Sequence, residues 1–124
     1  MHTLLSPLRI ATLALACAAA TACGGTSQNQ IDGGKTFLLG GEQRSAVFVE
    51  GRNVGAVPVE ILKELKGQRT PLITVAPGQT FEAVFEAGEI AMLRNTSASE
   101  QAVVKVTFNR DVSQLSMRYI DTNK

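Results

Sequence analysis

The sequence has few of the side chains on which most enzymes depend. It contains one histidine, His2, two cysteines, Cys17 and Cys23, and no tryptophan. Because His2 and both cysteines lie in the N-terminal segment, the rest of the chain has no Ser-His or Cys-His pair and no imidazole for zinc. It also has no pair of cysteines for a disulfide. The composition predicts a protein that is not an enzyme, with no catalytic residues, no metal site and no cofactor.

The sequence also has no excess of either acidic or basic residues. The chain has 12 basic and 11 acidic residues, which gives a formal net charge of +1. Such a balance creates no long-range field that would attract nucleic acid. We therefore expect no nucleic-acid partner, and no motif indicates a small-molecule substrate. Glu82, Glu86 and Glu89 form a possible carboxylate cluster for acid-base or calcium chemistry, but their spacing favours a solvated strand face.

The N-terminal segment has the pattern of a targeting signal. Arg9 precedes an apolar run over residues 10–22 that contains no charge and no proline. The run is too short for the roughly 20 residues of a membrane-spanning helix. It is followed by Ala20-Thr21-Ala22-Cys23, in which the small side chains suit a processing peptidase. These features predict a signal peptide over residues 1–22 that is cleaved.

Ala20-Thr21-Ala22-Cys23 resembles the lipobox of bacterial lipoproteins, although the family prefers a large aliphatic residue at the position of Ala20. The resemblance implies that Cys23 is acylated and anchors the protein to a membrane. Because Gly24 follows instead of an aspartate, it implies the outer membrane of the cell envelope. Cys17, after Ala14-Leu15-Ala16, is a second candidate for lipid attachment. Cleavage after Ala22 to give a soluble secreted protein is a further alternative.

The remaining chain divides into a linker and one domain. Residues 23–34 contain four glycines and almost no apolar side chains, so they are expected to form a flexible tether. Residues 35–124 are enough for a single domain with one core. From residue 35 onward apolar residues alternate with polar ones, most clearly over residues 101–109. Turn signals separate the strands, which are expected at residues 36–39, 45–50, 56–61, 71–75, 81–86, 89–94, 101–109 and 115–120.

Short strands with glycine and proline turns predict an all-β fold, a small antiparallel β-sandwich or barrel, similar in style to immunoglobulin-like envelope modules. One helical turn is expected over residues 60–66. The alternation predicts a core of Phe37, Phe48, Leu72, Phe81, Phe85, Met92, Val104, Val106, Phe108, Leu115, Met117 and Tyr119.

Two function classes fit these features. The first is a non-catalytic, lipid-anchored envelope protein, accessory or structural, that binds another envelope protein through an exposed edge or loop. The alternative is a lipid-tethered inhibitor or exclusion factor that acts against an enzyme, phage or receptor. In both, the candidate partner-binding residues are Arg52, Asn53, Arg94 and Asn95, which lie beside predicted turns.

Overall fold

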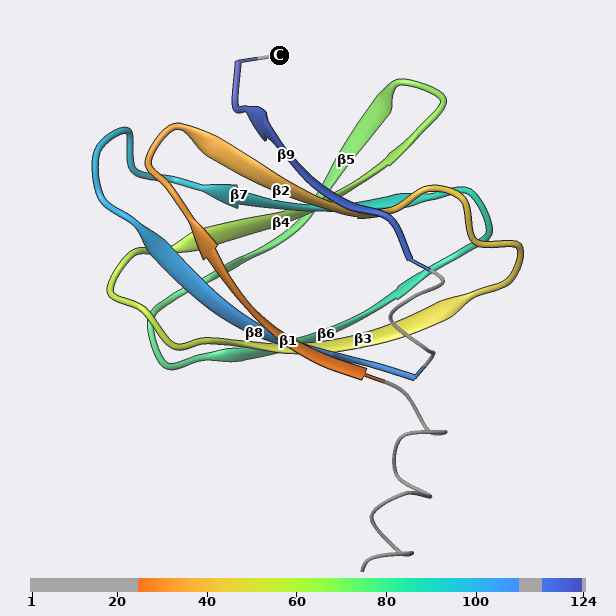
Figure 1. The fold of residues 1–124 in the computed structure, drawn as a ribbon, viewed down its shortest axis with the longest axis horizontal. Helices are drawn as coiled ribbons and strands as arrows, with labels where there is room; N and C mark the ends of the chain where they lie inside the picture. Colours follow the sequence, from red (N-terminus) through yellow and green to blue (C-terminus); the bar gives the residue numbers. More distant parts are fainter. Residues whose placement is uncertain (1–24, 110–114, 124) are drawn as a thin grey trace, which may run out of the picture.

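The computed structural model describes residues 25–109 and 115–123, which form nine β-strands and no helix. The strands pair into a four-stranded sheet A, in the order β1-β8-β3-β6, and a five-stranded sheet B, in the order β5-β4-β7-β2-β9. The two sheets lie face to face (Figure 1). The strands are β1 (Gly25–Ile31), β2 (Lys35–Gly40), β3 (Val47–Asn53), β4 (Val59–Leu65), β5 (Gln68–Val75), β6 (Thr80–Phe85), β7 (Ile90–Asn95), β8 (Ala102–Phe108) and β9 (Met117–Asp121).

The strand pairs are nested about the β4–β5 hairpin. β4 pairs with β5, β3 with β6, β2 with β7 and β1 with β8, all antiparallel. This is the order of a jelly roll, a long hairpin folded over into two sheets, and β9 adds a further strand beside β2. The prediction of a β-sandwich is confirmed. The immunoglobulin-like form is wrong, since immunoglobulin domains pair their first two strands and here β1 and β2 lie in different sheets.

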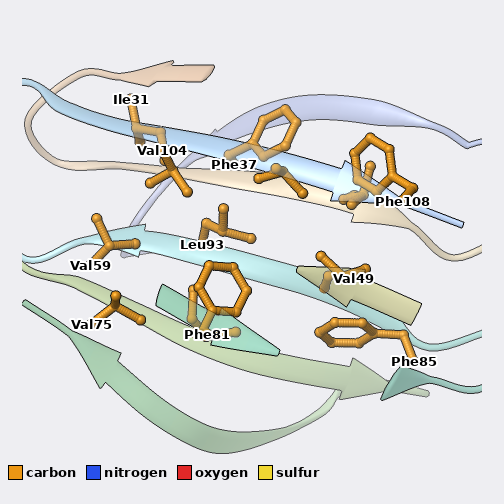
Figure 2. Packing of buried hydrophobic residues seen from close by; sticks show 14 of the residues in the cluster. Ile31, Phe37, Val49, Val59, Val75, Phe81, Phe85, Leu93, Val104 and Phe108 are labelled. Carbon is orange, nitrogen blue, oxygen red and sulfur yellow. The ribbon is translucent and has the colours of Figure 1, made fainter. Parts of the chain in front are cut away.

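The core lies between the sheets and follows the predicted alternation. Ile31, Val49, Val104 and Phe108 of sheet A belong to the same buried cluster as Phe37, Val59 and Leu93 of sheet B (Figure 2). Each of these side chains is at most 2% exposed. The predicted core residues that are buried are Phe37, Phe81, Phe85, Met92, Val104, Val106, Phe108 and Leu115. Met117 is partly buried against the core.

Three predicted core residues lie at the surface. The exposed fractions are 36% for Phe48, 42% for Leu72 and 49% for Tyr119. For Phe48 the alternation was assigned to the wrong face, because Val47 and Val49 point inward and the residue between them must point outward. Leu72 lies at an irregularity in the β4–β5 pairing, where Ile61 pairs with Ile73 but Leu62 pairs with Pro71. Tyr119 lies on β9, an edge strand.

Two further expectations are wrong. Most of the predicted tether is β1, which pairs with β8 from Gly25 opposite Phe108 to Ile31 opposite Ala102. Exposed positions of this segment alternate with less exposed ones, and Asn29 and Ile31 are buried. The predicted helical turn over residues 60–66 is instead β4, which turns into β5 through Lys66 and Gly67, both with positive φ. Pairing with two neighbouring strands outweighs the local helical pattern.

Candidate functional site

Asn53 and Asn95, predicted as partner-binding residues, are buried instead. Asn53 is 0% exposed, and its side-chain amide donates to the carbonyl oxygens of Val57 at 2.7 Å and Val75 at 3.0 Å. Its Oδ1 accepts from the amide of Gly55 at 3.0 Å. The side chain is therefore occupied in holding a loop, and the prediction that it projects towards a partner is wrong.

Asn95 is bound in the same way. It is 2% exposed, and its amide donates to the carbonyl oxygens of Ile31 at 2.8 Å and Glu100 at 2.7 Å. Its Oδ1 accepts from the amide of Ser97 at 2.7 Å. The expected polar turn after Asn95 is present, but the asparagine points into the protein to stabilise it.

Arg52 and Arg94 lie on strands and point away from the core. Arg52 is exposed on the outer face of sheet A, in β3. Arg94 lies in β7 of sheet B, where its guanidinium contacts the Glu60 carboxylate at 2.6 Å. The two arginines therefore lie on opposite faces of the sandwich, and no single loop brings them together.

The possible carboxylate cluster has a structural role. Glu89 is 8% exposed, and its Oε1 accepts from the backbone amide of Glu86 at 2.7 Å. Its Oε2 lies 3.4 Å from the ammonium of Lys63. Glu89 therefore closes the turn between β6 and β7. Among residues 25–109 and 115–123 no group of three histidine, cysteine or acidic side chains could hold a metal.

A polar cleft opens at the edge of the sandwich where the edge strands β1 and β9 lie. It has a volume of about 540 Å³. It is lined by Gln28, Gln30, Asp32, Lys35, Gln101 and Tyr119. The amide of Gln101 donates to Oδ1 of Asp32 at 2.9 Å, and Lys35 forms an ion pair with Asp121. The cleft therefore contains one acidic residue, Asp32, and one basic residue, Lys35, and each already has a partner. As a result the cleft is polar but close to neutral.

Tyr119 gives the cleft an aromatic wall. Its ring lies against the buried ring of Phe37, with 5.1 Å between centroids and 51° between planes. Partial burial raises the pKa of the Tyr119 phenol, and the negative charge of Asp32 raises it further. Tyr119 is also the only tyrosine of the chain. The phenol is therefore neutral at physiological pH and able to donate a hydrogen bond.

β1, which forms one side of this cleft, differs from the other edge strands. β5 contains Pro71 and a pairing irregularity, β6 contains Glu82, and β9 contains Arg118 and Asp121. Proline, charge and bulges all discourage a foreign strand from pairing with an edge. The sequence of β1, Gly-Thr-Ser-Gln-Asn-Gln-Ile, has no charge and no proline. β1 is therefore the edge best suited to pair with another chain.

Sequence reasoning missed this site because it assigned the segment to a tether. The one available signal was Ile31 at the end of an otherwise polar run, followed by Asp32-Gly33-Gly34 as a turn signal. Gln101 and Tyr119 come from distant parts of the chain, and only the nested topology brings them beside β1.

No protein-family model matches the chain, and no curated protein sequence matches it. Among solved structures, a mitogen from Yersinia pseudotuberculosis is similar with a TM-score of 0.43 and 11% identity, over 70% of this chain and 85% of that chain. An oxalate oxidase gives 0.47 and 16%, over 73% of this chain and 45% of its own. Peruvianin-I, a cysteine peptidase from Thevetia peruviana latex, gives 0.47 and 17%, over 74% and 55%. This chain spans about half the length of the last two. At these TM-scores the likeness carries no argument about function.

Proposed function

We propose that this chain is a non-catalytic, lipid-anchored protein of the cell envelope, an accessory or structural module that captures another envelope protein at the outer membrane. The observation that carries the proposal is β1, a polar edge strand with no charge and no proline beside a polar cleft. A partner in extended form would add a strand to sheet A along β1 and place its side chains in the cleft. The main-chain hydrogen bonds would give affinity, and the cleft would give selectivity.

The anchor part of the proposal rests on the lipobox resemblance at Cys23, which lies outside the described residues. β1 begins at Gly25, two positions after Cys23. An acyl chain on Cys23 would hold the start of β1 within a few residues of the membrane surface, since each extended residue spans at most about 3.6 Å. Partners captured at β1 would therefore be envelope proteins close to that surface. None of the described residues forms a helix that is long and apolar enough to cross a membrane.

The alternative function, a tethered inhibitor or exclusion factor, is favoured by a different feature. The β4–β5 hairpin extends beyond the body of the sandwich (Figure 1). Residues 65–74 are all exposed, including the apolar Leu65, Leu72 and Ile73. A projecting hairpin with apolar side chains can enter the active site or receptor groove of another protein.

Site-specific photo-crosslinking in living cells distinguishes these functions. We would place a photoreactive residue at Gln30 of β1, at Gln68 of the hairpin, or at the control position Thr74. Thr74 lies on the edge strand β5, where Pro71 and the pairing irregularity discourage strand addition. Capture along β1 predicts an adduct with a host envelope protein from Gln30 alone, weakened by Gln28→Lys and not by Thr74→Lys. Adducts from Gln68 with an exogenous protein would favour the inhibitor, and equal adducts from Gln30 and Thr74 would contradict selective capture.

Acylation is tested on the same full-length chain. We expect Cys23→Ala to give an unprocessed or soluble form and Cys17→Ala to give a membrane-bound, acylated product. Detergent partitioning and intact-mass measurement distinguish them. Acyl mass on Cys17, or a processed chain without acyl mass, would contradict the proposed anchor.

A further inference from the structure

The outer face of sheet A carries exposed side chains in a distinctive order. Along β3 and just beyond it, the residues that point away from the core are Phe48, Glu50, Arg52 and Val54. In chain order these are apolar, acidic, basic and apolar. Phe48 and Val54 are 36% and 45% exposed, so this strand face has an apolar side chain at each end.

Each neighbouring strand shares part of this order, and threonines occupy the other charged positions: Thr80 of β6 lies opposite Arg52 and Thr107 of β8 lies opposite Glu50. The register places Val84 opposite Phe48, Glu82 opposite Glu50, and Lys105 opposite Arg52. The backbone amide of Val54 donates to the carbonyl oxygen of Val103 at 3.0 Å, which brings a second valine beside it. The outer face of sheet A therefore has four rows across its strands: an apolar row, an acidic row, a basic row and an apolar row.

The two charged rows are unfavourable in a single copy of the chain. Like charges directly opposite one another on neighbouring strands destabilise a sheet. Within residues 25–109 and 115–123, none of Glu50, Glu82, Arg52 and Lys105 belongs to a salt bridge. Sheet B differs, since Arg94 contacts Glu60 and Arg69 contacts Glu64. The charges of sheet A thus lie in two adjacent like-charged rows whose members form no ion pair within the described residues.

Read in the opposite direction, the rows are apolar, basic, acidic and apolar. The reversed order therefore differs from the original only in that the acidic and basic rows have changed places. If the face is turned about a two-fold axis that crosses β3 between Glu50 and Arg52, apolar rows meet apolar rows and the acidic row meets the basic row. We infer that the outer face of sheet A binds the same face of a second copy of this chain. In a two-fold interface each contact occurs twice, so Glu50 meets Arg52 of the second copy and Arg52 meets its Glu50.

The shape of the face agrees with this pairing. The charged side chains surround a hollow of about 300 Å³, lined by Glu50, Arg52, Thr80, Glu82, Lys105 and Thr107. Facing sheets pack about 10 Å apart with interdigitating side chains. The hollow leaves room for the long charged side chains of the second copy, while Phe48 packs on its Val54.

The direction of the axis is compatible with partner capture at β1. An axis that crosses the strands reverses their direction but keeps β1 on the same side in both copies. The two β1 strands therefore lie on the same side of the dimer, where their uncharged Thr26, Gln28 and Gln30 continue the rows. The dimer does not rest on the proposed function, because it is argued from the charged and apolar side chains of β3, β6 and β8 and not from Cys23 or from strand addition at β1.

Co-purification of two differently tagged full-length copies tests the dimer. We expect the wild-type copies to purify together in a mild non-ionic detergent and to separate progressively as salt is added, because salt screens the charged rows. Glu50→Lys with Glu82→Lys makes both charged rows basic, and Arg52→Glu with Lys105→Glu makes both acidic. Each double variant is expected to weaken association with itself by about 100-fold or more, since facing like charges cost several kcal/mol.

Charge complementation is the sharper half of the test. When the all-basic variant is expressed with the all-acidic variant, the rows are opposite again and co-purification is expected to return. The matched control Glu42→Lys with Glu100→Lys changes net charge equally at exposed loop positions and is expected to leave association unchanged. Circular dichroism establishes that each variant is folded. Wild-type copies that never co-purify, or folded charge variants that fail to restore each other, would overturn the dimer.

Discussion

Asn53 and Asn95 hold the loops at one end of the sandwich with the same set of three side-chain hydrogen bonds. Each asparagine ends a strand, accepts from the backbone amide two residues later, and donates to two carbonyl oxygens. One of those carbonyls belongs to its own following loop and the other to a distant strand, β5 for Asn53 and β1 for Asn95. Val59 pairs with both Val75 and Asn95, so the two sets lie at the same end.

The first prediction concerns these buried amides. We expect Asn53→Ala and Asn95→Ala each to lower the free energy of unfolding by about 2 to 4 kcal/mol, because buried carbonyl oxygens lose their donor. Urea unfolding followed by circular dichroism measures this loss. Asn53→Asp should cost more than Asn53→Ala at neutral pH, because a carboxylate cannot donate and is buried beside two carbonyls. Its deficit should shrink as the pH falls and the carboxyl group becomes protonated, and a deficit that does not change with pH would contradict this assignment.

The second prediction compares two phenylalanines of sheet A. Phe108 is 2% exposed in the core and Phe48 is 36% exposed on the outer face. Phe108→Ala should therefore lower the free energy of unfolding by about 3 to 5 kcal/mol, whereas Phe48→Ala should change it by no more than about 0.5 kcal/mol in a dilute sample. Equal losses from the two substitutions, measured by urea unfolding, would mean that Phe48 also lies in the core.

The difference between these two residues shows what the alternation could and could not predict. In β8 the pattern from Ala102 to Phe108 has one apolar and one mostly polar face, and both were assigned correctly. In β3 apolar residues occur on both faces, since Val47 and Val49 point inward and Phe48 points outward, so the pattern did not indicate which face is buried. A shift by one residue exchanges the faces. The sequence therefore predicted the strands well, and the direction of their side chains only where one face was clearly polar.

The candidate site was less predictable than the core. Asn53 and Asn95 were correctly located beside turns, but the sequence does not indicate whether a turn asparagine faces solvent or reaches a distant carbonyl. β1 was missed because its stability comes from pairing with β8, more than seventy residues later, and not from its own composition. Nested pairing makes most such contacts non-local, so no local pattern contains them.

The third prediction tests a close approach in the core. A Cβ atom added at Gly51 would lie 2.2 Å from Cε2 of Phe81, closer than atoms can pack. We expect Gly51→Ala to lower the free energy of unfolding by about 1 to 3 kcal/mol through overpacking. In the double variant Gly51→Ala with Phe81→Leu, the loss should be smaller than the sum of the two single losses, because leucine removes the ring edge that clashes. The free energies of unfolding for this double-mutant cycle can be measured by thermal or urea unfolding. Additive losses would show that Phe81 is not the reason that residue 51 must be glycine.

The last prediction uses Tyr119, the only tyrosine of the chain, as a probe of the cleft. Because burial and the charge of Asp32 both raise its pKa, an absorbance titration of the folded chain should give a value above the ordinary one of about 10, with the chain unfolded in denaturant as the control. Asp32→Asn should lower the pKa only part of the way, since burial is the larger cause. A phenol whose pKa is raised by folding stabilises the fold while it is protonated, so this contribution is present below about pH 10 and is lost as the pH rises through the folded-state pKa. A folded-state pKa at or below 10, or one that Asp32→Asn leaves unchanged, would show that Tyr119 and Asp32 do not face the same cleft.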